Sequence, residues 1–150
     1  MKEGNKMKTY VAVDLGGTNI RAAIVDEEEK ILEIKKDKTE ASLGKEHVMA
    51  KMEELIASLD GLNEVLGIGL GIPGPTDTIN GKIILSNNLP DLIGYPIADR
   101  IRKRFNKPTF MANDVKVAGI AEALLGEGRG SNNLYYLTIS TGVAGAMILD

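Results

Sequence analysis

Residues 14–21 have the sequence Asp-Leu-Gly-Gly-Thr-Asn-Ile-Arg, and short apolar runs typical of β-strands stand on both sides of the glycines. The run before the glycines begins after Lys8, and the run after them covers residues 20–25. Residues 16–18 therefore form a tight turn between two strands, which we name the first turn. Because its glycines carry no Cβ, the backbone N–H groups of this turn can approach a phosphate closely.

The first turn differs from the two common nucleotide-binding motifs. A Walker A loop ends in Gly-Lys-Ser/Thr and a Rossmann fingerprint leads into a helix, whereas here a strand follows and no such lysine is present. The sequence therefore predicts a phosphate-binding hairpin, with an ordinary hairpin turn as the alternative. Asp14 favours phosphate binding, because a carboxylate at the end of a strand can hold Mg²⁺ directly or through water.

The last part of the chain repeats this plan. A predicted strand over residues 134–139, a Ser-Thr-Gly turn over residues 140–142 and a predicted strand over residues 143–149 offer a second phosphate-binding hairpin. When Asp26 is aligned with Asp150, a few further positions agree, which hints at a duplicated unit. Two turns of this design favour phosphate binding more strongly than one.

Further strands and helices are predicted between the two hairpins. The predicted strands cover residues 30–36, 65–72 and 108–112, and the predicted helices cover residues 44–60, the segment that begins at Pro96, and residues 114–125. Gly67, Gly69 and Gly71 leave one face of the middle strand without side chains, so we expect another segment to pack closely there.

Two of the predicted helices carry a recognisable face. Four basic residues between positions 100 and 104 indicate a solvated helix face, which we favour over an anion site. In the last helix we expect an inward apolar face. Its members are Val117, Ala118, Ala121, Leu124 and Leu125.

Asn113 and Asp114 stand directly after a predicted strand and directly before a predicted helix. Aspartate is a favoured N-cap residue, so one interpretation of Asp114 is purely structural. The other is that its carboxylate takes the proton from an attacking hydroxyl group. The two interpretations are compatible, because a capping residue can still face a cleft.

Composition excludes several classes of protein. The 150 residues include no cysteine and one histidine, which excludes disulfides, a thiolate nucleophile and a histidine-rich metal site within them. The net charge of -3, with scattered basic residues, argues against nucleic acid as a partner. Without a signal peptide or an apolar stretch long enough to span a bilayer, we expect no membrane association and a cytoplasmic location.

Taken together, the motifs resemble the ROK family of sugar kinases and related regulators. They are residues 14–21, Gly71-Ile-Pro-Gly-Pro75, Asn88-Leu-Pro90, Asn113-Asp114 with Ala121-Glu122, and Ser140-Thr-Gly142. The resemblance implies an α/β fold, namely a lobe of the actin-like ATPase (ribonuclease H-like) type with a mixed β-sheet and flanking helices. It also implies ATP-dependent phosphorylation of a hexose or amino-hexose hydroxyl, with ATP and Mg²⁺ as cofactors.

The resemblance also implies a role for each matching residue. Asp114 matches the catalytic base and Asn113 the adjacent ligand of a sugar hydroxyl, so both belong to the sugar site. Gly74 and Asn88 match further positions of the sugar pocket, and Asp14 matches the acid associated with Mg²⁺. The residues that match the two phosphate loops are Gly16, Gly17, Thr18, Asn19, Thr141 and Gly142.

The chain departs from the family pattern in two respects. Ala144 and Ala146 stand where family members often have glycine, and kinases of the family resemble this chain only over their first half. We therefore predict a first lobe over residues 1–130, with the catalytic aspartate, and the opening hairpin of a second lobe over residues 131–150. We expect little or no activity from the chain alone, and either self-association or association with a complementary C-terminal half.

Two alternatives to a sugar kinase follow from the same motifs. The first is a non-catalytic sugar- or nucleotide-binding lobe, or a fragment of a ROK-type regulator, but only a few polar residues precede Lys8 where a regulator carries its DNA-binding segment. The second is another actin-like protein, such as an acetate kinase. The Gly71–Gly74 motif and the Asn113-Asp114 pair argue against that second alternative.

Overall fold

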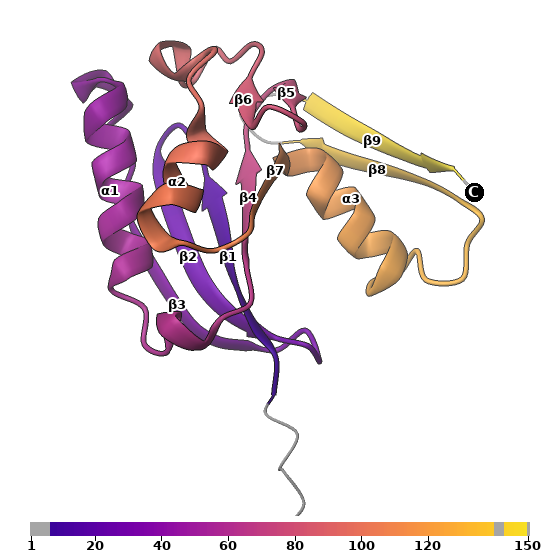
Figure 1. Ribbon diagram of the computed structural model, residues 1–150. Helices are drawn as coiled ribbons and strands as arrows, with labels where there is room; N and C mark the ends of the chain where they lie inside the picture. The colour runs from indigo at the N-terminus through magenta and orange to yellow at the C-terminus, as the bar shows by residue number, and fades with distance from the viewer. Residues whose placement is uncertain (1–6, 140–142, 150) are drawn as a thin grey trace, which may run out of the picture.

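The computed structural model describes residues 7–139 and 143–149. Its largest unit is a five-stranded mixed sheet with the strand order β3-β2-β1-β4-β7 (Figure 1). The strands are β1 (Thr9–Leu15), β2 (Asn19–Asp26), β3 (Ile31–Lys38), β4 (Ile68–Ile72) and β7 (Thr109–Asn113). β2 runs antiparallel to both β1 and β3, whereas β1, β4 and β7 are parallel. The predicted strands are confirmed, with small differences at their ends.

Two helices cover one face of this sheet, α1 (Lys45–Ala57) and α2 (Ile97–Phe105) (Figure 1). Along β1, Val11, Val13 and Leu15 are buried against the helices and the even-numbered residues face the other way, as the two-residue period of a strand requires. The core between sheet and helices includes Val11, Val13, Leu15, Ile20, Leu70, Met49, Met52, Ile56, Ile97 and Ile101. Burial of these side chains holds the layers together and fixes the sheet as a platform.

The basic residues of α2 lie only partly in solvent. Arg102, Lys103 and Arg104 are exposed, as predicted. Arg100 is not, because it binds Glu53 of α1 through two hydrogen bonds, of 2.6 Å and 3.1 Å, and also pairs with Glu46. The interpretation of the whole cluster as a solvated face is therefore wrong for Arg100, which joins the two helices.

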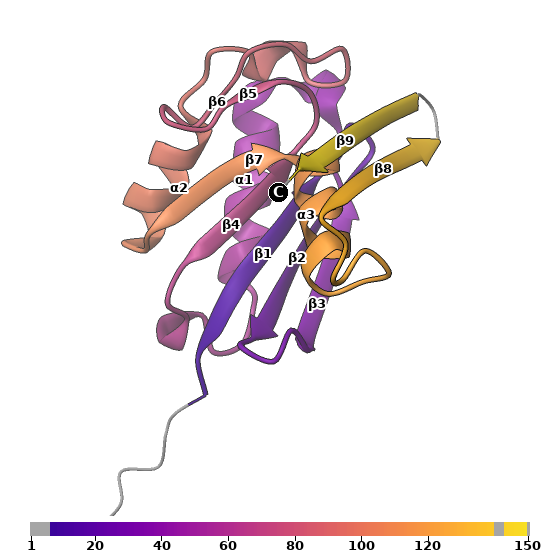
Figure 2. The same ribbon diagram turned by 90° about the vertical axis from the view of Figure 1, so that its right-hand side faces the viewer.

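The second face of the sheet is largely open (Figure 2). The expected close packing on the three glycines holds at Gly67, which is buried and where a Cβ would lie 3.2 Å from the Pro108 carbonyl oxygen. It also holds at Gly71, where a Cβ would lie 3.8 Å from the Cα of Asp114. It is wrong at Gly69, which is exposed and would have only the Val11 carbonyl oxygen, 4.0 Å away, as a neighbour. On the neighbouring strand Phe110 is 74% exposed. Gly69 and Phe110 thus border a hollow over the sheet.

A helix and a separate two-stranded sheet border this hollow. They are α3 (Asp114–Leu124), β8 (Asn133–Ile139) and β9 (Val143–Leu149). α3 packs on the β8–β9 hairpin through Gly119, where a Cβ would lie 3.0 Å from Ile148 and 3.1 Å from Ala146. The expected inward apolar face of this helix is wrong for four of its five members, because the helix turns its glycine toward the hairpin. The exposed members are Val117, Ala121, Leu124 and the following Leu125.

Short elements complete the structure. They are β5 (Thr76–Asp77), β6 (Lys82–Ile83) and the 3₁₀ turns η1 (Ala41–Leu43), η2 (Leu62–Glu64) and η3 (Pro90–Leu92). Among the helices of the described residues, none has the length and apolar character needed to cross a membrane.

Candidate active site

The candidate site lies where the parallel strands end. Asp14 stands beside Gly71 in the register of β1 and β4, and Ile72 stands beside Asn113 in the register of β4 and β7. Because the carboxyl ends of neighbouring parallel strands meet at one edge of a sheet, the loops that follow these strands converge there. The topology therefore brings together residues that are far apart in the sequence.

Asp114, the first residue of α3, is half-buried at this edge. Its Oδ1 atom accepts hydrogen bonds from the side chain of Asn113, at 2.9 Å, and from the backbone of Val115, at 2.8 Å. Burial raises the pKa of the Asp114 carboxyl above its ordinary value, and the negative charge of Asp14 acts in the same direction. This carboxyl therefore accepts a proton more readily than an exposed aspartate does.

The N-cap of α3 is Asn113, not Asp114. The Oδ1 atom of Asn113 accepts a hydrogen bond of 3.0 Å from the backbone N–H of Lys116, which corrects the expected capping role of Asp114. Asp114 therefore does not cap the helix, and hydrogen bonds from Asn113 and Val115 orient its carboxyl. The structural part of the sequence interpretation was wrong by one residue.

Asn113 also connects the helix to the Gly74 loop. Its Nδ2 atom donates a hydrogen bond of 3.0 Å to the carbonyl oxygen of Gly74. Gly74 has a φ of 87°, and a Cβ there would lie 2.1 Å from the Leu85 carbonyl oxygen, so only glycine fits. Two predicted sugar-site residues, Gly74 and Asn113, are therefore in direct contact.

The first turn lies against another predicted sugar-site residue. A Cβ on Gly17 would come within 2.8 Å of the Asn88 Cβ, which places Asn88 directly over the turn. Gly16 donates a hydrogen bond of 2.8 Å to the Asn19 carbonyl oxygen and closes the hairpin. Within the described ranges, no acceptor meets the N–H groups of Gly17 and Thr18. Those two amides are available to an external anion.

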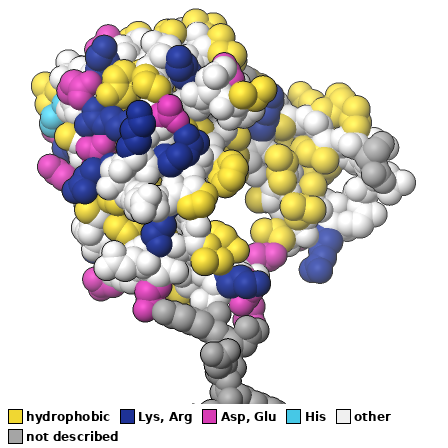
Figure 3. Space-filling view, viewed as in Figure 1, with side chains coloured by type: hydrophobic (Ala, Val, Ile, Leu, Met, Phe, Trp, Pro, Cys, Tyr) yellow, Lys and Arg dark blue, Asp and Glu magenta, His cyan; other side chains and the backbone are white. Residues whose placement is uncertain are grey.

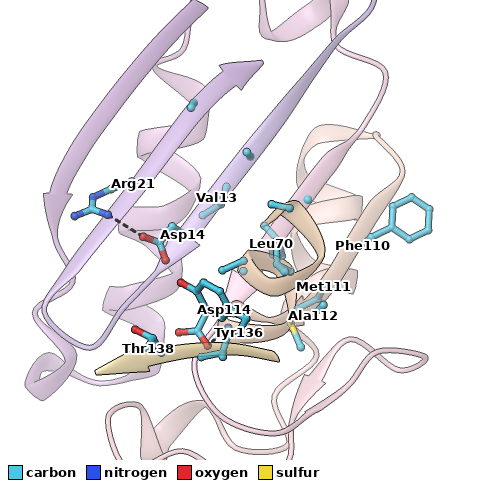
Figure 4. A pocket seen from close by; sticks show the side chains of 18 of the residues that line it. Val13, Asp14, Arg21, Leu70, Phe110, Met111, Ala112, Asp114, Tyr136 and Thr138 are labelled. Atoms are coloured by element: carbon cyan, nitrogen blue, oxygen red, sulfur yellow. Dashed lines mark hydrogen bonds and ion pairs between the residues drawn. The ribbon is translucent and has the colours of Figure 1, made fainter. Parts of the chain in front are cut away.

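Asp14 and Asp114 line the same cavity, whose volume is about 960 Å³ (Figure 4). The sheet supplies one wall, including Gly69 and Gly71, and α3 and β8 supply the other. Arg21, the register partner of Asp14 on β2, donates a hydrogen bond of 3.2 Å to the Asp14 carboxylate and lines the cavity too. The cavity therefore holds two carboxyls and one guanidinium.

In the described part of the chain, no three His, Cys, Asp or Glu side chains gather into a metal-binding cluster. Mg²⁺ does not require one, because it usually takes one or two protein carboxylates and completes its shell with water and substrate phosphates. The exposed carboxylate of Asp14 fits that pattern. A metal held in this way would depend on bound phosphate.

Of the predicted site residues, Asp14 and Asp114 line the cavity. Asn113 contacts Asp114 and Gly74, and Gly17 lies against Asn88. Asn113, Gly74, Asn88 and the first turn do not themselves line the cavity.

Thr141 and Gly142 lie outside the described residues, so the second turn stays a prediction. Sequence reasoning gave no role to Arg21, although it belongs to the quoted motif, and it missed Thr39, which contacts the first turn. Local pattern carries no signal for Thr39, because the contact joins residues 23 positions apart.

Comparison with known proteins identifies the chain. The family model described as "ROK family" matches residues 10–150. This chain belongs to the ROK family. The expected resemblance is thereby confirmed.

Individual ROK proteins agree with this assignment. A glucokinase from Thermotoga maritima is 35% identical over 138 residues, which cover 92% of this chain and 44% of the glucokinase. The chain also matches the crystal structure of a ROK family glucokinase from Streptomyces griseus in complex with glucose and AMPPNP. That match has a TM-score of 0.84 and 28% identity, and covers 94% of this chain and 44% of the other.

A ROK hexokinase from Thermus thermophilus matches with a TM-score of 0.79 and 32% identity, over 94% of this chain and 47% of that one. The expected actin-like fold with a mixed sheet and flanking helices is thus confirmed. The chain spans a little under half the length of these ROK relatives.

Proposed function

We propose that this chain carries the catalytic base and a phosphate-binding turn of a kinase that uses ATP to phosphorylate a hydroxyl group of a hexose or amino-hexose. The observation that carries the proposal is the shared cavity, in which the half-buried Asp114 and the exposed Asp14 lie at one end of the sheet. The sugar kinases among the ROK relatives support the same class of reaction.

Asp114 is proposed as the general base. Hydrogen bonds from Asn113 and Val115 hold its carboxyl in one orientation, so it can meet a sugar hydroxyl without rearrangement. Its raised pKa makes it a better proton acceptor than an exposed aspartate. The sugar would lie against Asn113, which donates a hydrogen bond to this carboxyl, and against Gly74 and Asn88.

The residues present fit ATP and Mg²⁺. When bound, these cofactors supply the phosphoryl group and offset its negative charge. The unpaired N–H groups of Gly17 and Thr18 would hold phosphate oxygens, and Asp14 would hold the metal. Arg21 adds a positive charge beside Asp14. Thr141 and Gly142 would contribute the second phosphate turn, and Asn19 closes the first one.

Nucleotide and sugar binding by the chain test this proposal directly. Titration calorimetry with AMPPNP and Mg²⁺, and separately with glucose and glucosamine, should give saturable heats. In any assembly of the chain that releases ADP, Asp114→Ala should retain sugar binding and lower turnover about 10²- to 10⁴-fold. Asp77→Ala, at the last residue of β5, is the matched control and should leave turnover unchanged.

Two results would contradict the proposal. Near-normal turnover of Asp114→Ala would remove this residue from the role of base. A chain that binds the sugar but never releases ADP in any assembly would instead favour the alternative of a non-catalytic sugar-binding lobe.

We further propose that the chain works together with more protein, either a second copy or a complementary C-terminal half. The hydrophobic side chains of α3, β8 and β9 gather on the right-hand side of Figure 3, beyond the hollow over the sheet. Such a surface is unusual for a monomer, because exposed apolar patches of this kind commonly mark interfaces. We expect the chain alone to show little or no kinase activity.

A further inference from the structure

We propose that Thr39 is a positioning residue for the first turn, holding it in the shape that binds phosphate; this inference rests on the proposed function. Thr39 lies just beyond the end of β3. Its side-chain hydroxyl donates a hydrogen bond of 2.6 Å to the Gly16 carbonyl oxygen. Its backbone N–H donates a second one, of 3.0 Å, to the Thr18 carbonyl oxygen.

These two bonds fix the orientation of the turn. The carbonyl groups of Gly16 and Thr18 stand on either side of Gly17, and both are drawn toward the same residue. A peptide group is planar, so the peptide whose carbonyl oxygen belongs to Gly16 points its N–H, that of Gly17, the opposite way. Thr39 therefore presents the Gly17 amide to an external anion instead of to the protein.

Thr39 is itself held firmly. Its exposed fraction is 1%, and the β2–β3 ladder runs up to the Asn19–Lys38 pair directly before it. Lys51 of α1 binds two carboxylates that flank Thr39 in the sequence, those of Asp37, at 3.0 Å, and Glu40, at 2.8 Å. The ladder with β2 and the ion pairs with α1 therefore hold Thr39 in place, and Thr39 in turn holds the first turn.

The hydroxyl bond and the backbone bond can be separated by mutation. Thr39→Val keeps the shape and the backbone N–H but removes the hydroxyl, which leaves the partly buried Gly16 carbonyl without its donor. Thr39→Ser restores the hydroxyl. Thr109 offers a matched control, because it is equally buried, at 2% exposure, and its hydroxyl also donates to a carbonyl oxygen, that of Lys107, at 3.0 Å. Thr109 begins β7, at the end of the sheet opposite the site.

The test is the affinity of the chain for tripolyphosphate with Mg²⁺, measured by titration calorimetry. Loss of one such hydrogen bond should weaken binding about tenfold in Thr39→Val. Thr39→Ser should bind within about twofold of the wild type, and Thr109→Val should bind like the wild type although both valine variants lose some stability. Wild-type affinity in Thr39→Val, or an equal loss in Thr109→Val, would overturn the proposal.

The amide resonances of Gly17 and Thr18, recorded without ligand, separate this inference from the proposed function. They should shift and exchange faster with solvent in Thr39→Val, and return to wild-type values in Thr39→Ser. If the wild type binds no polyphosphate but these resonances shift in Thr39→Val, the proposed phosphate binding is refuted and the positioning role of Thr39 is supported. If the resonances do not shift in Thr39→Val, the positioning role of Thr39 is refuted.

Discussion

At the scale of single residues, the proposed catalytic role of Asp114 comes with a cost in stability. Burial raises the pKa of its carboxyl in the folded chain, so the ionised form is less favourable there than in the unfolded chain. Its contribution to stability is therefore fully present below the unfolded pKa, about 4, and is lost as pH rises through the folded pKa. We predict that Asp114→Asn, which cannot ionise, unfolds at a higher temperature than the wild type near neutral pH, and that the difference disappears toward pH 4. Thermal unfolding followed by circular dichroism across this pH range measures it.

Asp77 provides a control of opposite sign. Hydrogen bonds from the side chain and backbone of Asn80 lower the pKa of the Asp77 carboxyl. Its stabilising contribution is present above its unfolded pKa and is lost as pH falls through the folded pKa. Asp77→Asn should therefore unfold at a lower temperature than the wild type near neutral pH. The same sign for both variants would contradict the assigned pKa shift of Asp114.

At the scale of elements, the contact between α1 and α2 depends on Arg100. Its guanidinium binds Glu53, whose side chain is only 17% exposed, and it also donates hydrogen bonds to the Tyr95 hydroxyl and the Glu46 carboxylate. Removing the guanidinium leaves the Glu53 charge partly buried and unpaired. We predict that Arg100→Ala lowers the free energy of unfolding by about 1–3 kcal/mol, measured by urea denaturation.

Lys103, three residues later on the exposed side of α2, serves as the control for Arg100. Lys103→Ala should change the free energy of unfolding by no more than about 0.5 kcal/mol. Equal losses in the two variants would mean that charge on α2, and not the contact with α1, sets the stability.

At the scale of the whole molecule, the outer face of the β8–β9 hairpin is an apolar surface that is exposed to solvent. Alternate residues pack against α3, and the others expose between 49% and 73% of their surface: Tyr135, Leu137, Ile139, Val143, Met147 and Leu149. We predict that the chain self-associates through this face, so that its sedimentation coefficient rises with concentration. Met147→Lys should abolish that rise, because a buried lysine charge is costly.

Ile79→Lys is the matched control, since Ile79 is 92% exposed and lies in the β5–β6 turn, away from the hairpin. It should associate like the wild type. A chain that sediments as a monomer at every concentration would refute self-association and leave a complementary half as the proposed partner.

Sequence reasoning predicted the structural elements around the candidate site correctly where the signal is local. The first turn and its flanking strands have a pattern that needs no knowledge of distant residues, and the structure confirms the hairpin. The Asn113-Asp114 pair was found because it stands between a strand and a helix. The sequence did not show which of the two residues caps the helix, because capping depends on the φ and ψ of each residue and both side chains can cap.

The apolar face of α3 shows the opposite case. Periodicity identified a helix with apolar residues, but it cannot say which surface the helix meets. In the structure Gly119 faces the hairpin, since the missing Cβ lets the helix backbone approach Ile148 and Ala146, and Val117 is left exposed. The division of the chain at residue 130 stays a prediction.

By itself, the sequence of this chain determined its elements, its family resemblance and the residue types of its site, because strand periodicity, turn chemistry and motif order are local properties. Only the tertiary structure decided that Asn88 lies over Gly17, that Asn113 donates a hydrogen bond to Gly74, and that Thr39 donates one to the first turn. The physical reason is that these contacts join segments distant in sequence, whose approach is set by the strand order of the sheet and the packing of its helices.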